Sequence, residues 1–279
     1  MAQLVEHHLA KVRVAGSNPV VRSRRLLGRR VARAVCSLAA LVITLSGVVA
    51  CSSDSRADVV VAAASDTRKA FTEVAEILLD KHGLRADFVF GSSGMLREQV
   101  LSGAPYDVYV SANLQFVDEV IDAGVAEAES RRAFAVGRLA VISAAGVRLP
   151  NDLAAVADYE RIVMANPAHA PYGVAAREAL RSLGLYEALQ SKLVLADNVA
   201  DAVRIVGAGE ADLGIVALAL VIDEPHLDVP TALHQPIRQS LVITTHGSDN
   251  LAARRFIEVL ESPEGRRILV RYGFMLEST

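Results

Sequence analysis

The chain has 279 residues, of which 52% are hydrophobic and 22% charged, a composition typical of a folded protein rather than a disordered or fibrous one. It has no Trp and 5% aromatic residues, which argues against a carbohydrate cleft lined by stacking rings. The net charge of −3 hides a split: residues 1–50 hold eight Lys and Arg and one Glu, leaving 21 basic and 31 acidic residues after them. Nucleic-acid binding needs a basic face, so the acidic body is a poor candidate and no nucleic-acid partner is expected.

The basic N-terminal segment is predicted to be an export signal. Its uncharged run, residues 35–50, has sixteen residues. A membrane-spanning helix needs about 20, whereas a signal peptide needs fewer. The run ends in small residues before Cys51, and a polar stretch comes after it, as in a bacterial lipobox. We therefore expect residues 1–50 to be a signal peptide and residues 51–57 a lipid tether, with acylated Cys51 anchored at the extracytoplasmic face of the cell membrane.

The alternative is a plain signal peptide followed by an incidental Cys51. Cysteine usage favours the lipoprotein. The only other cysteine, Cys36, would be removed with the signal, so no intramolecular disulfide could form. A lone thiol is a liability in an oxidising compartment, and a thioether to lipid removes it. Residues 1–25 resemble a translated tRNA gene, which predicts a true start downstream. The competing interpretation is a twin-arginine signal at residues 23–27.

The body alternates apolar runs with amphipathic stretches. We expect strands at 58–64, 84–90, 107–111, 139–143, 161–165, 193–196, 213–217 and 241–245. We expect helices at 66–82, 91–102, 114–123, 173–183, 199–208, 249–260 and 263–271. This alternation predicts an α/β fold with parallel sheets covered by helices, in two lobes. In such sheets, ligands bind at the carboxyl ends of the strands.

The sequence lacks the motifs of the common catalysts. It has no His-Glu-x-x-His, no paired Cys, no Gly-x-Ser-x-Gly and no Walker loop. His169 lies in a segment rich in turn residues, 166–173, where a turn residue is a better interpretation than a metal ligand or general base. We therefore expect no enzyme activity, no cofactor and no metal held directly by side chains.

Hydroxyl groups and turns at predicted helix starts are the more informative feature. Ser65 lies between a strand and a helix, and Ser92 and Ser93 precede the next helix. Tyr172 and Val199 lie at the starts of two later helices. Each position alone is explained by helix capping. Together they suggest a site for an oxyanion, because helix N-termini present free N–H groups and a partial positive charge.

With these residues, the chain resembles the periplasmic molybdate-binding proteins of ABC importers, from about residue 58 to residue 274. The motifs that carry the resemblance are Ala62-Ala-Ala-Ser65, Phe90-Gly-Ser-Ser93, Gly103-Ala-Pro-Tyr-Asp-Val-Tyr-Val-Ser-Ala112, Asn166-Pro-Ala-His-Ala-Pro-Tyr-Gly173, Asp212-Leu-Gly-Ile-Val216 and Arg271-Tyr-Gly-Phe274. The resemblance implies two Rossmann-like lobes joined by a hinge, the type II class of periplasmic binding proteins. We expect the chain to cross between lobes near 138–143 and 235–245. Lobe 1 would comprise 57–138 and 240–279, and lobe 2 would comprise 139–239.

The resemblance also implies the ligands of the anion. The hydroxyl groups of Ser65 and Ser93 and the backbone amides of Tyr172 and Val199 fall on the family's binding positions, with Ser92 adjacent. One position departs from the pattern: better-known members carry a Tyr that donates to the anion where this chain has Ala217.

The resulting prediction is a monomeric lipoprotein receptor that binds molybdate or tungstate and delivers it to an ABC permease in the membrane. One alternative is a receptor for another oxyanion, such as sulfate or phosphate. A second is a secreted serine hydrolase that uses Ser65 or Ser93 with His169. A third is the effector domain of a cytoplasmic regulator. The export signal argues against that last alternative.

Overall fold

The computed structural model describes residues 57–277 of the chain. The predicted signal peptide, Cys51 and the tether before residue 57 lie outside the described residues. Within residues 57–277, no helix has the length and apolar character needed to cross a membrane.

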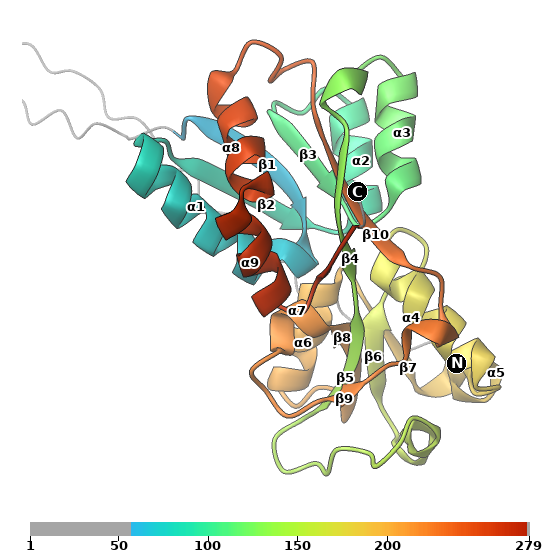
Figure 1. Cartoon of the computed structure of the whole chain (residues 1–279). Helices are drawn as coiled ribbons and strands as arrows, with labels where there is room; N and C mark the ends of the chain where they lie inside the picture. Colours follow the sequence, from blue (N-terminus) through green and yellow to red (C-terminus); the bar gives the residue numbers. More distant parts are fainter. Residues whose placement is uncertain (1–56, 278–279) are drawn as a thin grey trace, which may run out of the picture. The chain divides into compact units, whose positions relative to one another are not determined.

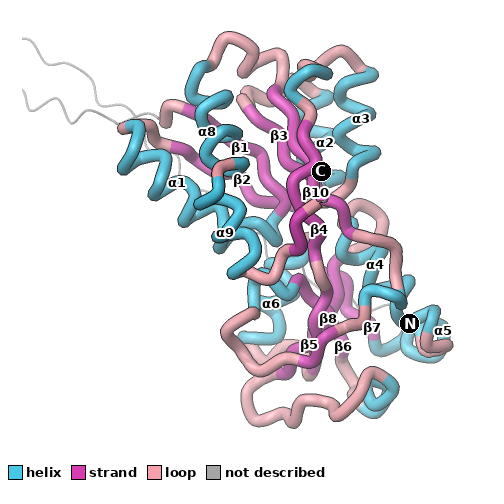
Figure 2. Tube along the Cα trace, in the orientation of Figure 1, coloured by secondary structure: helices cyan, strands magenta, loops and turns pink. Residues whose placement is uncertain are grey.

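Two separate β-sheets form the framework (Figures 1 and 2). The first has the strand order β11 (Met275–Leu276), β4 (Arg132–Gly137), β10 (Ile237–Ile243), β3 (Val108–Ser111), β1 (Val59–Ala64), β2 (Ala86–Gly91). The second has the order β7 (Leu193–Ala196), β6 (Ile162–Ala165), β8 (Leu213–Ala217), β5 (Leu139–Ser143), β9 (Leu227–Asp228). We call the first sheet with its helices lobe 1 and the second sheet with its helices lobe 2.

Helices cover both faces of the lobe 1 sheet (Figure 1). Along β1, Val59, Val61 and Ala63 join one apolar cluster, whereas Ala62 joins another, because successive side chains of a strand point to opposite faces. The first cluster packs under α1 (Arg68–His82), α8 (Leu251–Glu261) and α9 (Pro263–Arg271). The second packs under α2 (Ser93–Leu101) and α3 (Leu114–Asp122).

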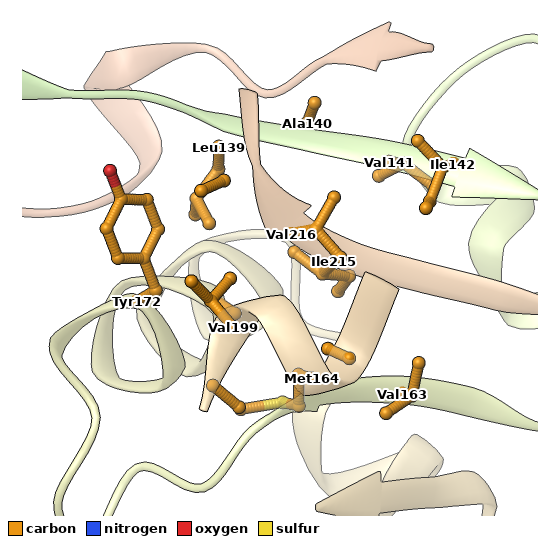
Figure 3. Packing of buried hydrophobic residues seen from close by; sticks show 14 of the residues in the cluster. Leu139, Ala140, Val141, Ile142, Val163, Met164, Tyr172, Val199, Ile215 and Val216 are labelled. Atoms are coloured by element: carbon orange, nitrogen blue, oxygen red, sulfur yellow. The ribbon is translucent and has the colours of Figure 1, made fainter. Parts of the chain in front are cut away.

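Lobe 2 has its own apolar core, part of which is drawn in Figure 3. Strands β5, β6 and β8 are buried along most of their length, as their continuous apolar runs predict. The helices of this lobe are α4 (Pro171–Ser182), α5 (Tyr186–Leu189), α6 (Val199–Gly207) and α7 (Leu218–Val221). Short 3₁₀ turns complete the described chain: η1 (Ser65–Thr67), η2 (Ala128–Ser130), η3 (Ala154–Asp158), η4 (Gln190–Lys192) and η5 (Thr231–Leu233).

The chain passes between the two sheets at two places. Arg138 alone separates β4 from β5, and residues 234–236 lead from η5 into β10. The proposed limits of the lobes, 57–138 with 240–279 and 139–239, remain a prediction. Strand β10 crosses the second limit, because it begins at Ile237.

The predicted two-lobed α/β fold is confirmed, with one correction to the sheets. Both are mixed rather than purely parallel, since β10 is antiparallel to β3 and β4, and β5 is antiparallel to β8. Strands β1, β2 and β3 pair in parallel, as do β6, β7 and β8. The antiparallel pairs include the strands that flank the crossings, because a chain that leaves lobe 1 through β4 must return in the opposite direction through β10.

Candidate functional site

The five residues predicted to bind an anion all line one cavity between the lobes. In this closed form the cavity is small, with a volume of about 10 Å³ open to the centre of a water-sized sphere. Its wall is formed by Ala64, Ser65, Asp66, Gly91, Ser92, Ser93, Ala112, Ala170, Pro171, Tyr172 and Val199. Ser65 follows β1 and Ser92 follows β2, whereas Tyr172 and Val199 lie in the first turns of the helices that follow β6 and β7. The carboxyl ends of the strands therefore bring these residues together, as expected for an open α/β sheet.

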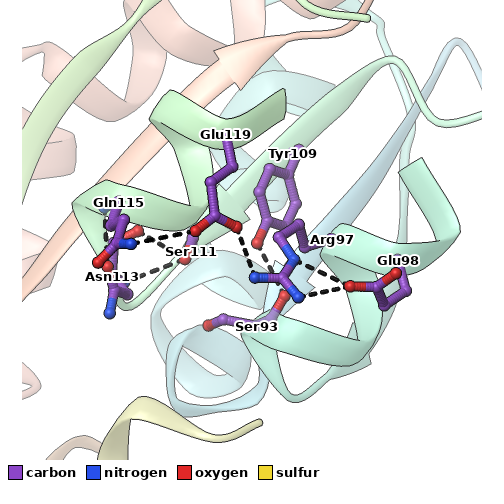
Figure 4. A network of polar contacts seen from close by, with 8 residues as sticks. All are labelled: Ser93, Arg97, Glu98, Tyr109, Ser111, Asn113, Gln115 and Glu119. Carbon is purple, nitrogen blue, oxygen red and sulfur yellow. Dashed lines mark hydrogen bonds and ion pairs between the residues drawn. The ribbon is translucent and has the colours of Figure 1, made fainter. Parts of the chain in front are cut away.

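Ser93 is held by two hydrogen bonds within lobe 1. Its Oγ accepts a hydrogen bond from the Ala112 amide at 3.0 Å, and its carbonyl oxygen accepts one from the Tyr109 hydroxyl at 2.8 Å. Figure 4 shows Tyr109 next to Arg97, which pairs with Glu98 and Glu119 on the outer side of α2 and α3. Because the Ser93 oxygen already accepts a bond, its O–H remains available to donate.

Ser65 contributes a hydroxyl group from the end of β1. It opens the 3₁₀ turn η1 and not the helix itself, which begins at Arg68, and its side chain makes no capping bond. Its Oγ instead accepts from the Ala200 amide of lobe 2 at 3.4 Å. The Ser65 hydroxyl group can therefore also donate into the cavity. Ser92 is the N-cap of α2, and its Oγ accepts from the Met95 amide at 3.4 Å.

Lobe 2 contributes backbone amides at two helix starts. Tyr172 follows Pro171, the first residue of α4. Val199 is the first residue of α6, and the Asn198 side chain caps that helix by accepting from the two amides after Val199. Among the described residues, no acceptor is bonded to the amides of Ser93, Tyr172 or Val199. Unpaired amides at helix N-termini are suited to bind an anion.

The two lobes touch beside this cavity. The Gly94 amide donates to the His169 carbonyl oxygen at 2.9 Å, and Ser92 Oγ lies 2.8 Å from His169 Nδ1. A Cβ atom on Gly94 would lie 2.7 Å from the His169 carbonyl oxygen, so only glycine permits this approach. The interlobe contact therefore depends on backbone atoms on both sides.

This geometry does not support the serine hydrolase alternative. His169 contacts Ser92, whereas Ser65 and Ser93 have other partners. In the part of the chain that the structure describes, no hydrogen bond joins His169 to a carboxylate that could orient its ring.

Asp66 is a cavity residue that the sequence reasoning missed. Its side chain is buried, and Oδ2 accepts hydrogen bonds from the Tyr172 hydroxyl at 2.9 Å and Gln239 Nε2 at 2.8 Å. Burial raises the pKa of Asp66 to about 7, and these hydrogen bonds oppose that rise. Burial, followed by the adjacent Asp66, raises the pKa of Tyr172 well above its usual value. Gly137 leaves room for this cluster, because a Cβ there would lie 2.0 Å from the Tyr172 oxygen.

Ala217 is the position where a donor was expected to be missing. It is fully buried at the end of β8, and it does not belong to the cavity wall. Its methyl group cannot donate a hydrogen bond, and the Tyr172 phenol, which could have replaced the missing donor, donates to Asp66 instead.

The cavity can hold an anion through neutral donors from both lobes. None of its lining residues is Lys, Arg or His. Among residues 57–277, no group of three or more His, Cys, Asp and Glu side chains is placed to hold a metal ion. The available chemistry is therefore hydrogen bonding to an oxyanion by hydroxyl groups and helix amides.

Two α/β lobes with a cavity between them are the architecture of periplasmic solute-binding proteins. The chain belongs to the bacterial extracellular solute-binding protein family, whose model matches residues 59–275. The members of this family bind solutes and are not enzymes.

The relatives narrow the class further. The molybdate-binding protein ModA of Azotobacter vinelandii is 34% identical over 86% of this chain and 99% of its own length. The solved structure of the periplasmic molybdate-binding protein of A. vinelandii has a TM-score of 0.75 and 29% identity, covering 79% of this chain and all of that one. A putative ABC transporter substrate-binding lipoprotein of Bacillus subtilis is 26% identical over 81% of this chain and 89% of its own length.

Proposed function

We propose that this protein binds molybdate, or its analogue tungstate, in the cavity between its lobes. The observation that carries the proposal is the convergence of two serine hydroxyl groups and three unpaired helix amides on one cavity with no cationic side chain. Such donors suit a fully ionised oxyanion, because the O–H group of a protonated anion would face an N–H or O–H donor of the protein and find no acceptor. The relatives supply the identity of the anion, since the geometry alone fits any tetrahedral dianion of suitable size.

Binding requires the lobes to separate and close again. Ser65, Ser92 and Ser93 belong to lobe 1, whereas Tyr172 and Val199 belong to lobe 2, so the full donor set exists only when the lobes are together. The two crossings, at Arg138 and at residues 234–236, are the segments about which a hinge motion would occur. We infer that the closed form is the one that delivers the anion to an ABC permease.

Isothermal titration calorimetry with molybdate, tungstate, sulfate and phosphate tests the choice of anion. We expect saturable heat with molybdate and tungstate at one anion per protein. Sulfate is also a tetrahedral dianion but is smaller than molybdate, so we expect it to contact the donors of both lobes less well and to bind more weakly. A protein that binds sulfate or phosphate and gives no heat with molybdate or tungstate would belong to the alternative class of oxyanion receptors.

We further propose that the mature protein is held at the extracytoplasmic face of the cell membrane by lipid on Cys51. The support is the lipobox-like sequence before Cys51 and the existence of a lipoprotein among the relatives. In cells that express the full chain, a Cys51→Ala variant should lose incorporation of labelled fatty acid and should no longer sediment with membranes. Retention of both label and sedimentation by that variant would show that Cys51 is not the anchor.

A further inference from the structure

Asp66 places a carboxyl group in the wall of the cavity, where the proposed function does not use it. The side chain is 1% exposed. Both partners of Oδ2 are neutral side chains, Tyr172 and Gln239, and Figure 3 shows that Tyr172 directs its hydroxyl group away from the apolar core of lobe 2. The other carboxyl oxygen, Oδ1, is buried and has no hydrogen-bond partner among the described residues. A buried polar atom without a partner is costly, which suggests that a bound ligand supplies the missing bond.

An ionised Asp66 conflicts with a dianion in the same cavity. Two negative groups that share a site with little solvent repel each other. This repulsion weakens anion binding unless one of the two groups is neutralised by a proton. Within residues 57–277, no cationic side chain pairs with Asp66 to offset this charge. In the first turn of α1, which follows η1, the charged residues are Arg68 and Lys69, and those of α6 are Asp201 and Arg204, whereas the other charged residues of α1 lie further along that helix. These four residues line a separate groove on the outer side of α1 and α6. The third neighbouring helix, α7, has no charged residue. The titratable group that contacts Asp66 is the Tyr172 hydroxyl.

The energetically favourable solution is a neutral carboxyl group. Burial already raises the pKa of Asp66 to about 7, and a bound dianion would raise it further. A carboxylic acid kept neutral by its surroundings has an O–H that can donate to a developing or bound oxyanion. The Oδ2 atom can accept from Tyr172 and Gln239 in either protonation state, so the proton belongs on the partnerless Oδ1.

We propose that Asp66 takes up one proton from solvent when the anion binds and then donates a hydrogen bond from Oδ1 to the oxyanion. Asp66 is thereby an anion-binding residue, and the receptor takes up a proton together with its anion. The inference rests on the proposed function. Protonated Asp66 gives the cavity the hydrogen-bond donor that Ala217 cannot provide. All polar groups that contact the anion would then be donors.

The direction of the pH dependence follows from linkage. Opening of the lobes would separate Asp66 from Tyr172 and admit water, which would lower the pKa of Asp66 toward its ordinary value of about 3.9. Burial in the closed form raises the pKa of Asp66 to about 7, and a bound dianion would raise it further. Between these two values the free protein is ionised and the complex is protonated, so binding takes up close to one proton and affinity falls up to about tenfold for each unit of rising pH. Above the pKa of the complex the affinity levels off.

The test is molybdate calorimetry between pH 5.5 and 8.5, in pairs of buffers that differ in ionisation enthalpy. Molybdate remains a dianion in this range, so the protons counted belong to the protein. We expect wild-type protein to take up about one proton near pH 6 and to bind more weakly as pH rises. Asp66→Asn should show no such uptake and a flat profile, and it should bind at least as tightly as wild type at pH 8.5. Asp201→Asn, an equal change of charge outside the cavity, should retain the wild-type profile.

Further variants keep the result decisive. If Asp66→Asn does not fold, Tyr172→Phe serves instead: loss of the hydroxyl donor to Oδ2 should move the fall in affinity to higher pH. His169 is the other titratable residue beside the cavity, and His169→Gln should keep the proton uptake even if it binds more weakly. Binding of molybdate with no proton uptake, or pH dependence that survives in Asp66→Asn, would overturn the inference but not the proposed function. Binding of phosphate to a protein whose Asp66 stays ionised, with no proton uptake, would also overturn the inference about Asp66. Absence of molybdate binding at every pH would reject the proposed function itself.

Discussion

Ser65 and Ser93 show how single hydroxyl groups can be prepared for an anion. In each residue the Oγ atom accepts a hydrogen bond from a backbone amide, that of Ala200 for Ser65 and that of Ala112 for Ser93. A hydroxyl group has one proton to donate and can also accept, so a bond accepted from an amide leaves that proton free. Among the described residues, neither hydroxyl group donates to a protein acceptor, so both can donate to an anion.

Removal of either hydroxyl group should therefore weaken anion binding selectively. We expect Ser65→Ala and Ser93→Ala each to lower the affinity for molybdate by about 1–3 kcal/mol, the usual contribution of a hydrogen bond to a charged group. Calorimetry at one pH measures this loss, and thermal unfolding without anion checks that the fold is retained. Ser102→Ala is the matched control, because Ser102 lies at the opposite, exposed end of α2. Affinity unchanged in both Ser65→Ala and Ser93→Ala would exclude these residues from the site.

Single residues also mark the limit of sequence reasoning at this site. All five predicted residues lie in the cavity wall, because a hydroxyl group or turn between a strand and a helix is a local pattern. Asp66 follows Ser65 directly, yet an acid in the first turn of a helix ordinarily indicates a solvated surface or a favourable helix dipole. Its burial depends on Tyr172 and Gln239, which are 106 and 173 residues away in the chain. No local pattern contains that information.

At the scale of elements, helices were easier to predict than the strands at the crossings. The predicted helix 114–123 is α3 (Leu114–Asp122), and its N-cap Asn113 accepts from the Gln115 amide. Strand β4 was not predicted, and β10 begins at Ile237, four residues before the predicted strand 241–245. In β10 the early residues include the polar Gln239, which is fully buried in the interlobe cluster. A functional polar residue inside a strand conceals the apolar run by which strands are recognised.

The same elements explain why the sheets were expected to be parallel. Alternating strands and helices indicate parallel pairing, and β1, β2 and β3 follow that rule. A strand such as β10 pairs with β3 and β4, which precede it by more than 90 residues, and its direction depends on the route of the chain through lobe 2. Pairing of this kind is a property of the topology, and composition or periodicity does not predict it.

For the whole of the described molecule, the close contact between lobes implies a measurable motion. The Gly94 amide of lobe 1 donates to the His169 carbonyl oxygen of lobe 2, so this hydrogen bond must break whenever the lobes separate. The Leu96 amide, two residues further along α2, donates to the Ser92 carbonyl oxygen within lobe 1. Hydrogen exchange at these two amides therefore distinguishes opening of the lobes from local unfolding of α2.

We expect anion binding to slow exchange at Gly94 and to leave Leu96 little changed. If the anion must leave before the lobes open, an anion concentration of 100 times Kd stabilises the closed form by about 2.7 kcal/mol, which slows exchange at Gly94 about 100-fold. Amide-resolved exchange by NMR, with and without molybdate, measures both positions in one sample. Equal protection of Gly94 and Leu96 would indicate that the anion stabilises lobe 1 as a whole, and unchanged exchange at Gly94 in a saturated sample would exclude a hinge that opens across this contact.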